Sequence, residues 1–159
     1  MGAYFITICT WNKECLFRDV ADGQLQLNGY GKVVQEEWLR TAIIRPNVIL
    51  DEFIVMPNHC HGIMVISGPG RGVLPYAPTT RRTPFGSPSQ TIGAIVRGFK
   101  SAVTKRINTK RHVSRVPVWQ RNYYERVIRD DSEMHRIREY IAENPARWLE
   151  DEENPNRQL

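Results

Sequence analysis

The pattern of apolar and polar positions predicts four strands in this chain. Residues 3–11 (AYFITICTW) alternate between the two kinds and are rich in aromatic and β-branched residues, which favours a strand. Residues 48–56 (VILDEFIVM) and 61–66 (HGIMVI) predict two further strands joined by a tight connection. The fourth predicted strand covers residues 116–129 (VPVWQRNYYERVIR), which include strong β formers.

Three segments have the periodicity of amphipathic helices. Apolar side chains recur near helical spacing in residues 32–44 (KVVQEEWLRTAII), and Pro46 ends that helix. Residues 90–108 (QTIGAIVRGFKSAVTKRIN) carry an apolar stripe with basic residues on the other side. Residues 130–144 (DDSEMHRIREYIAEN) begin with N-capping residues and end before Pro145. The order β-α-β-β-α-β-α predicts an α+β, ferredoxin-like fold: a split βαββαβ antiparallel sheet with an added C-terminal helix.

The length of the chain, 159 residues, favours a single domain over residues 1–159. Residues 67–89 are dense in Gly, Pro, Ser and Thr and predict a flexible internal loop. Residues 149–159 form an acidic tail. The chain has no run of roughly 20 apolar residues, no signal-peptide pattern, and only three cysteines. We therefore expect a cytoplasmic protein with no membrane partner.

The positive charge is concentrated in one part of the chain. The formal net charge is +5, and between Arg97 and Arg129 ten Lys and Arg residues are opposed by Glu125 alone. Such a block indicates a polyanion partner, most often nucleic acid, although a solvated basic surface is the simpler alternative. The candidate DNA-binding residues lie on the second predicted helix, in the fourth strand and in the internal loop: Arg97, Lys100, Lys105, Arg121, Arg81 and Arg82.

The motif HCH places two histidines in a predicted strand. Side chains two apart share one face of a strand, so His59 and His61 project together while Cys60 faces away. Two imidazoles on a rigid strand are half of a metal site. Tyr140 and Asn144 are four apart and share one face of the last helix. An amide oxygen can bind Mg²⁺ or Mn²⁺, and a phenol near a cation is a candidate nucleophile. These residues together predict phosphodiester cleavage through a covalent phosphotyrosine.

The motif PNHCHGI resembles the His-hydrophobic-His motif of the HUH nucleases. Four blocks in the same order resemble the REP-associated tyrosine transposases, which are relatives of the single-tyrosine insertion-sequence transposases. These blocks are LDEFIVMPNHCHGIMVI, TIGAIVRGFKSAVTKRIN, VWQRNYYERVIRD and YIAENPARW. The similarity runs from Tyr4 to Trp148, which is nearly the whole chain.

The resemblance implies a ferredoxin-like domain that binds single-stranded DNA, commonly hairpins from palindromic repeats. In such enzymes a histidine pair and a polar helix residue hold Mg²⁺ or Mn²⁺. A helix tyrosine attacks the phosphate and leaves a 5′-phosphotyrosine and a free 3′-hydroxyl, and this step is reversible. The metal-binding positions correspond to His59, His61 and Asn144, and the tyrosine corresponds to Tyr140. Related enzymes often have Gln at the position of Asn144.

Several alternatives remain open at the level of the sequence. Tyr123 and Tyr124 compete with Tyr140 for the role of nucleophile. A non-catalytic module that binds single-stranded nucleic acid is a second functional class, because this fold also binds RNA or DNA on its sheet. A zinc site that combines the histidine pair with Cys9 and Cys15 ranks low, because no Cys-x-x-Cys pair is present. A monomer and a homodimer, with the tyrosine acting in its own subunit or in the partner, are both allowed.

Overall fold

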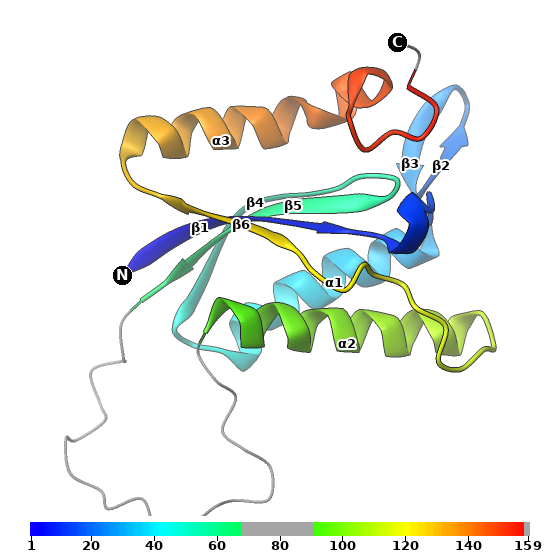
Figure 1. Ribbon diagram of the computed structural model, residues 1–159, viewed down its shortest axis with the longest axis horizontal. Coiled ribbons are helices and arrows are strands. Elements are labelled where there is room, and N and C mark those ends of the chain that lie inside the picture. Colours follow the sequence, from blue (N-terminus) through cyan, green and yellow to red (C-terminus); the bar gives the residue numbers. More distant parts are fainter. Residues whose placement is uncertain (68–90, 158–159) are drawn as a thin grey trace, which may run out of the picture.

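The computed structural model describes residues 1–67 and 91–157, which form a four-stranded antiparallel sheet with helices on both faces (Figure 1). The elements in chain order are β1 (Gly2–Cys9), η1 (Trp11–Lys13), β2 (Arg18–Ala21), β3 (Gln24–Leu27), α1 (Gly29–Ile44), β4 (Val48–Val55), β5 (His59–Ile66), α2 (Ile92–Lys110), β6 (Tyr124–Ile128), α3 (Asp131–Glu143) and η2 (Asn144–Glu150). The strand order in the sheet is β4-β5-β1-β6, and β2 pairs with β3 in a separate hairpin. The predicted α+β, ferredoxin-like fold with an added C-terminal helix is therefore confirmed.

Helices α1 and α2 cover one face of the sheet and α3 covers the other, as Figure 1 shows. The larger apolar cluster includes Trp38 of α1 and Phe99 of α2. A smaller cluster contains Phe5, Ile63 and Ile141 of α3. None of the helices in the described parts of the chain is long and apolar enough to cross a membrane. The sheet therefore has a larger apolar core on the face covered by α1 and α2, and a smaller one on the face covered by α3.

Strand β5 carries alternating side chains to these two faces. Ile63 belongs to the cluster under α3, whereas Cys60 and Met64 belong to the cluster under α1 and α2. His59 and His61 have the same parity as Ile63, so they lie on the α3 face. The sequence prediction that the two histidines project together, with Cys60 turned away, is confirmed.

Gly62 allows α1 to pack closely against the strand that carries the histidines. The ring of Trp38 stacks on Phe53, with ring centroids 4.5 Å apart and planes inclined by 6°. A Cβ atom at position 62 would lie 2.4 Å from Trp38 Cζ2. Any side chain there would displace the indole from a close-packed core. The tight contact on this face therefore supports the backbone that positions His61 on the opposite face.

The predicted strand over residues 116–129 is wrong in its first part, because β6 covers only Tyr124–Ile128. Before β6, Trp119 makes an isolated bridge to Thr10, the residue that follows β1. Side chains of α2 instead take the backbone carbonyls of this segment: Asn108 Nδ2 donates to the carbonyl of residue 116, and Lys100 Nζ donates to that of residue 120. Local β propensity is outweighed here by tertiary hydrogen bonds.

Most of the predicted loop over residues 67–89 lies outside the described residues, and so do Arg81 and Arg82. Ser67 is described, and its backbone N–H and its hydroxyl both donate to the carbonyl of Asn47.

Helix α3, which carries Tyr140, begins with a side-chain cap. Asp130 Oδ1 accepts a hydrogen bond from the backbone N–H of Glu133 at 2.7 Å. Glu133 Oε2 in turn accepts from the N–H of Arg129 at 2.9 Å. The sequence predicted this cap, because Asp130 stands three residues before Glu133. The first bond satisfies an N–H group that a helix start would otherwise leave without a partner, and the second connects the residue before the cap to the same turn.

Replacing Asp130 by alanine is expected to lower the free energy of unfolding by about 1 kcal/mol, because the cap hydrogen bond is lost. Urea unfolding followed by circular dichroism measures this change. Asp131→Ala is the matched control, because it removes a carboxylate from the same helix turn without removing the cap. An equal loss in both variants would show that charge near the helix start, and not the cap, provides the stability.

Candidate active site

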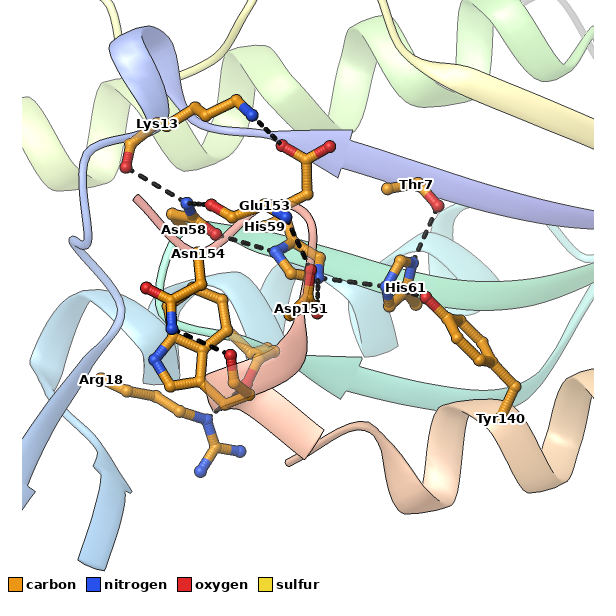
Figure 2. Close-up of polar contacts among 12 residues, drawn as sticks. Thr7, Lys13, Arg18, Asn58, His59, His61, Tyr140, Asp151, Glu153 and Asn154 are labelled. Atoms are coloured by element: carbon orange, nitrogen blue, oxygen red, sulfur yellow. Dashed lines mark hydrogen bonds and ion pairs between the residues drawn. The ribbon is translucent and has the colours of Figure 1, made fainter. Parts of the chain in front are cut away.

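Two adjacent imidazoles, those of His59 and His61, form the centre of the candidate site (Figure 2). Both side chains are buried, and their Nε2 atoms are 3.1 Å apart. His59 Nδ1 lies 2.8 Å from Asn58 Oδ1, and His61 Nδ1 lies 2.8 Å from Thr7 Oγ1. Because an amide oxygen can only accept, His59 Nδ1 carries the ring proton and its Nε2 keeps a free lone pair.

Burial keeps both imidazoles neutral at pH 7. Desolvation lowers the pKa of His61 to about 3, and the nearby His59 adds to this effect. Desolvation also lowers the pKa of His59, although the carboxylates of Asp151 and Glu153 act in the opposite direction. A neutral imidazole is the form that coordinates a metal ion. The pair is therefore in the protonation state that a cation requires.

The spacing of the two Nε2 atoms suits two ligands of a single cation. Two nitrogens that each lie about 2.1 Å from a metal, at right angles, are about 3.0 Å apart. Asn144 Oδ1 lines the same cleft as His61 and is buried without a hydrogen-bond partner. A buried amide oxygen without a partner is uncommon in folded proteins. In residues 1–67 and 91–157, no three His, Cys, Asp or Glu side chains are grouped as a metal site.

Tyr140 of α3 reaches the histidine pair within a single chain. Its hydroxyl lies 3.4 Å from His61 Nε2, and the two rings meet edge to face with centroids 5.3 Å apart (Figure 2). Burial raises the pKa of Tyr140, and a hydrogen bond from the Asn144 side chain acts against this effect. The phenol is therefore protonated at neutral pH, and a positive charge nearby would favour its ionisation.

An ion pair attaches the tyrosine helix to the edge strand β4. Arg138 Nε and Nη2 donate to the two carboxylate oxygens of Asp51. This bidentate pairing joins α3 to the sheet two residues before Tyr140, and Ile141 is buried one residue after it. The helix is thus held on both sides of the tyrosine.

The other two candidate nucleophiles have different surroundings. The Tyr123 hydroxyl donates to Glu125 at 2.9 Å, and burial raises the pKa of Tyr123 to about 12, with the Glu125 bond adding to the shift. Tyr124 is the first residue of β6 and is 54% exposed. Within the described parts of the chain, the only tyrosine hydroxyl in hydrogen-bond contact with the histidine pair is that of Tyr140.

The site opens into a cleft of about 740 Å³ that is acidic next to His59. The acidic part is formed by the segment after α3: η2 and the turns that follow fold back over the site. Asp151 Oδ2 lies 3.7 Å from His59 Nε2, and Glu153 pairs with Lys13 at 3.3 Å (Figure 2). Sequence reasoning classed these residues as part of an acidic tail and missed their position, because a short 3₁₀ helix has no periodic signal that predicts where it packs.

A second groove, of about 710 Å³, follows α2 on the other side of the segment 120–123. Its lining includes five cations: Arg97, Lys100, Lys105, Arg115 and Arg121. None of the described residues that line it is acidic, whereas the cleft beside the histidine pair is lined by four acidic residues. The groove and the cleft share Gln120, Asn122 and Tyr123. The segment 120–123 therefore forms a ridge between a basic groove and an acidic cleft.

Lys100, predicted as a DNA contact, lies beneath this ridge. Its ammonium donates to the carbonyl oxygens of Gln120 at 2.5 Å and Arg121 at 3.2 Å. Burial lowers the pKa of Lys100. Its hydrogen bonds are therefore directed to the protein backbone, and its role as a DNA contact stays a prediction.

Comparison with known proteins gives one close relative by sequence. No family model matches the chain. An uncharacterized protein of Haemophilus influenzae is 44% identical over 153 residues, which cover 95% of this chain and 84% of that protein.

Two solved structures align with most of this chain, one of them with a TM-score above 0.5. The structure of a REP-associated tyrosine transposase bound to a REP hairpin is 16% identical, with a TM-score of 0.55 over 92% of this chain and 67% of that one. A candidate transposase of Deinococcus radiodurans is 14% identical, with a TM-score of 0.47 over 89% of this chain and 90% of that one. The chain therefore belongs to the family of the Haemophilus influenzae protein and has the fold of a REP-associated tyrosine transposase, as its sequence blocks predicted.

Proposed function

We propose that this protein is a transposase-type enzyme that cuts and rejoins single-stranded DNA through a covalent bond to Tyr140. The observation that carries the proposal is the 3.4 Å approach of the Tyr140 hydroxyl to His61 Nε2 within one chain. Three separate elements contribute to this arrangement, namely β5, α3 and the start of η2. Their convergence at one end of a cleft supports chemistry at this place.

The proposed metal ligands are His59, His61 and Asn144. The free Nε2 lone pair of His59, the neighbouring Nε2 of His61 and the orphaned Asn144 oxygen support this choice. The amide oxygen suits Mg²⁺ or Mn²⁺ in an open site, and the resemblance to the HUH nucleases supports these ions with a histidine pair. When bound, such a cation withdraws charge from a phosphate oxygen and favours the ionised phenol.

Tyr140 supplies the nucleophile in the proposed reaction. Its oxygen forms a bond to the phosphorus while the bond from phosphorus to the 3′ oxygen breaks. The phenol gives up its proton and the leaving 3′ oxygen takes up one, so the products are a 5′-phosphotyrosine and a free 3′-hydroxyl. Attack of a 3′-hydroxyl on the phosphotyrosine reverses the step and joins strands. The ion pair between Arg138 and Asp51 limits the motion of the phenol. The entropy cost of orienting the nucleophile for attack is therefore lower.

The proposed substrate is single-stranded DNA from hairpin-forming repeats. The related fold was solved with a REP hairpin, and the basic groove beside the cleft supports a polyanionic ligand here. Arg97, Lys105 and Arg121 are proposed to contact phosphates along this groove. Arg81 and Arg82 are proposed as further contacts, although they lie outside the described residues. Lys100 is proposed to support the ridge between groove and cleft from below.

A denaturing gel with hairpin DNA and Mn²⁺ tests this function. DNA labelled at its 3′ end should become covalently attached to protein, because the phosphotyrosine retains the 3′ fragment. DNA labelled at its 5′ end should give a shorter strand with an extendable 3′-hydroxyl. A chelator should prevent both products. Binding of the hairpin without either product, at any metal concentration, would instead indicate a non-catalytic nucleic-acid-binding module.

Removing the groove cations is expected to weaken DNA binding in a salt-dependent way. Each phosphate contact to a single strand contributes roughly 0.7 to the slope of log affinity against log salt. The triple variant Arg97→Ala, Lys105→Ala, Arg121→Ala should therefore reduce this slope by about two. Fluorescence anisotropy at several salt concentrations measures it. Lys32→Ala, which removes an exposed cation from α1, is the control and should leave the slope unchanged.

A further inference from the structure

We infer that Tyr124 is a stacking platform for an unpaired DNA base beside the scissile phosphate. This inference rests on the proposed function and adds a positioning residue to it. Tyr124 would hold the base flat against its ring, and the attached phosphate would then be directed toward Tyr140 and the histidine pair.

Strand register places Tyr124 at the level of the histidines. His61 of β5 pairs with Thr7 of β1, and Thr7 pairs with Tyr124 of β6. The three residues thus form one row across the sheet. Thr7 also contacts His61 Nδ1 at 2.8 Å. Because directly paired side chains share a face, Tyr124 stands on the α3 face, two strands away from His61.

Aromatic contacts link Tyr124 to the reacting groups through the floor of the cleft. The buried ring of Phe5 stacks on His61, with centroids 5.4 Å apart and planes inclined by 25°. Tyr124 and Tyr140 each meet Phe5 edge to face, with centroids 6.3 Å and 6.1 Å away. The two tyrosines are 54% and 44% exposed and both line the cleft. The site therefore has a buried aromatic floor with a half-exposed phenol ring on either side.

A single exposed tyrosine needs no explanation by itself. Tyr124, however, directly follows the ridge 120–123, whose residues line both the basic groove and the cleft. A strand whose phosphates follow the groove would reach the cleft at this ring. Stacking on an aromatic side chain holds a base without regard to its identity. In the described residues the Tyr124 hydroxyl makes no hydrogen bond that would fix it for another role.

A second copy of the chain is the competing occupant, because β6 is an edge strand of the sheet. A strand added at that edge would use the free backbone groups of β6. The Tyr124 ring instead contacts Phe5 and borders the cleft. The structure therefore favours a base over a partner strand at this ring.

The test measures binding without cleavage, in the Tyr140→Phe background. Fluorescence anisotropy with fluorescein-labelled dT12 gives the affinity. Tyr124→Thr keeps β propensity and removes the ring, and it is expected to weaken binding by between about 5-fold and 150-fold. Tyr124→Phe keeps the ring and should stay within about twofold of the parent. Trp11→Ala, which removes an exposed ring outside the cleft lining, is the matched control and should bind like the parent.

A second readout reports stacking directly. A dT12 strand with one 2-aminopurine should lose fluorescence on binding to the parent and to Tyr124→Phe, and should lose much less on binding to Tyr124→Thr.

Each remaining outcome has a defined meaning. Equal affinity and equal quenching in Tyr124→Thr and the parent would overturn the stacking role and leave the proposed function in place. Failure of the parent to bind dT12 and hairpin DNA alike would overturn the proposed function itself. A Tyr124→Thr variant that turns a dimer into a monomer with unchanged DNA affinity would assign the ring to a subunit interface, and it would also overturn the inference.

Discussion

Replacing Tyr140 by phenylalanine is expected to abolish the covalent adduct and to lower the nicking rate by at least about a thousandfold, because the substitution removes only the nucleophilic oxygen. The ring contacts of Tyr140 with Phe5 and His61 can persist in the variant. Hairpin affinity should therefore change little. Single-turnover nicking with 3′-labelled hairpin DNA and Mn²⁺ measures the rate, and anisotropy measures the binding.

The competing tyrosines supply matched controls for this experiment. Tyr123→Phe removes a hydroxyl that donates to Glu125, and Tyr124→Phe removes a hydroxyl at the side of the cleft. Both variants should form the adduct. An adduct that persists in Tyr140→Phe and disappears in Tyr123→Phe would identify Tyr123 as the nucleophile in place of Tyr140. Peptide mapping of the DNA-linked tyrosine gives an independent answer.

The local geometry of the site was predictable because it depends on short-range periodicity. The strand period places His59 and His61 on one face, and the helix period places Tyr140 and Asn144 on another. Each expectation needed only the element type, which apolar alternation and capping residues indicate clearly. The approach of the phenol to the imidazole was supported by the resemblance to known transposases, and the structure brings the two together within one chain.

Features that depend on tertiary packing were not predictable from the sequence. Lys100 has the spacing of an exposed basic residue, yet its ammonium is directed to carbonyls in a segment twenty residues further along the chain. The same contacts hold residues 116–123 outside the strand, which begins only at Tyr124. Asp151 reaches the histidines only because η2 turns the chain back over the site. No local sequence pattern predicts these contacts, because each depends on how two elements that are distant in sequence pack together.

Replacing His61 by alanine is expected to raise the dissociation constant for Mn²⁺ by more than about 100-fold, because a direct ligand is lost. Thr7→Val, which removes only the hydroxyl behind the His61 ring, should raise it by about 10- to 100-fold, as is typical for residues that orient a ligand. Isothermal titration calorimetry measures both constants. His135→Ala removes an exposed imidazole on α3 and serves as the control. Unfolding curves should verify that each variant is folded.

The pH dependence of Mn²⁺ binding separates this buried pair from two ordinary histidines. Protons compete with a cation only when the imidazole takes them up in the free protein. Two histidines with a pKa of about 6.5 would lose roughly tenfold in affinity between pH 7.5 and pH 6. Burial lowers the pKa of both site histidines, and that of His61 to about 3, so the wild-type affinity should stay nearly constant over this range. A tenfold loss would show that the imidazoles take up protons from solvent, and that the closed packing around them opens before the cation binds.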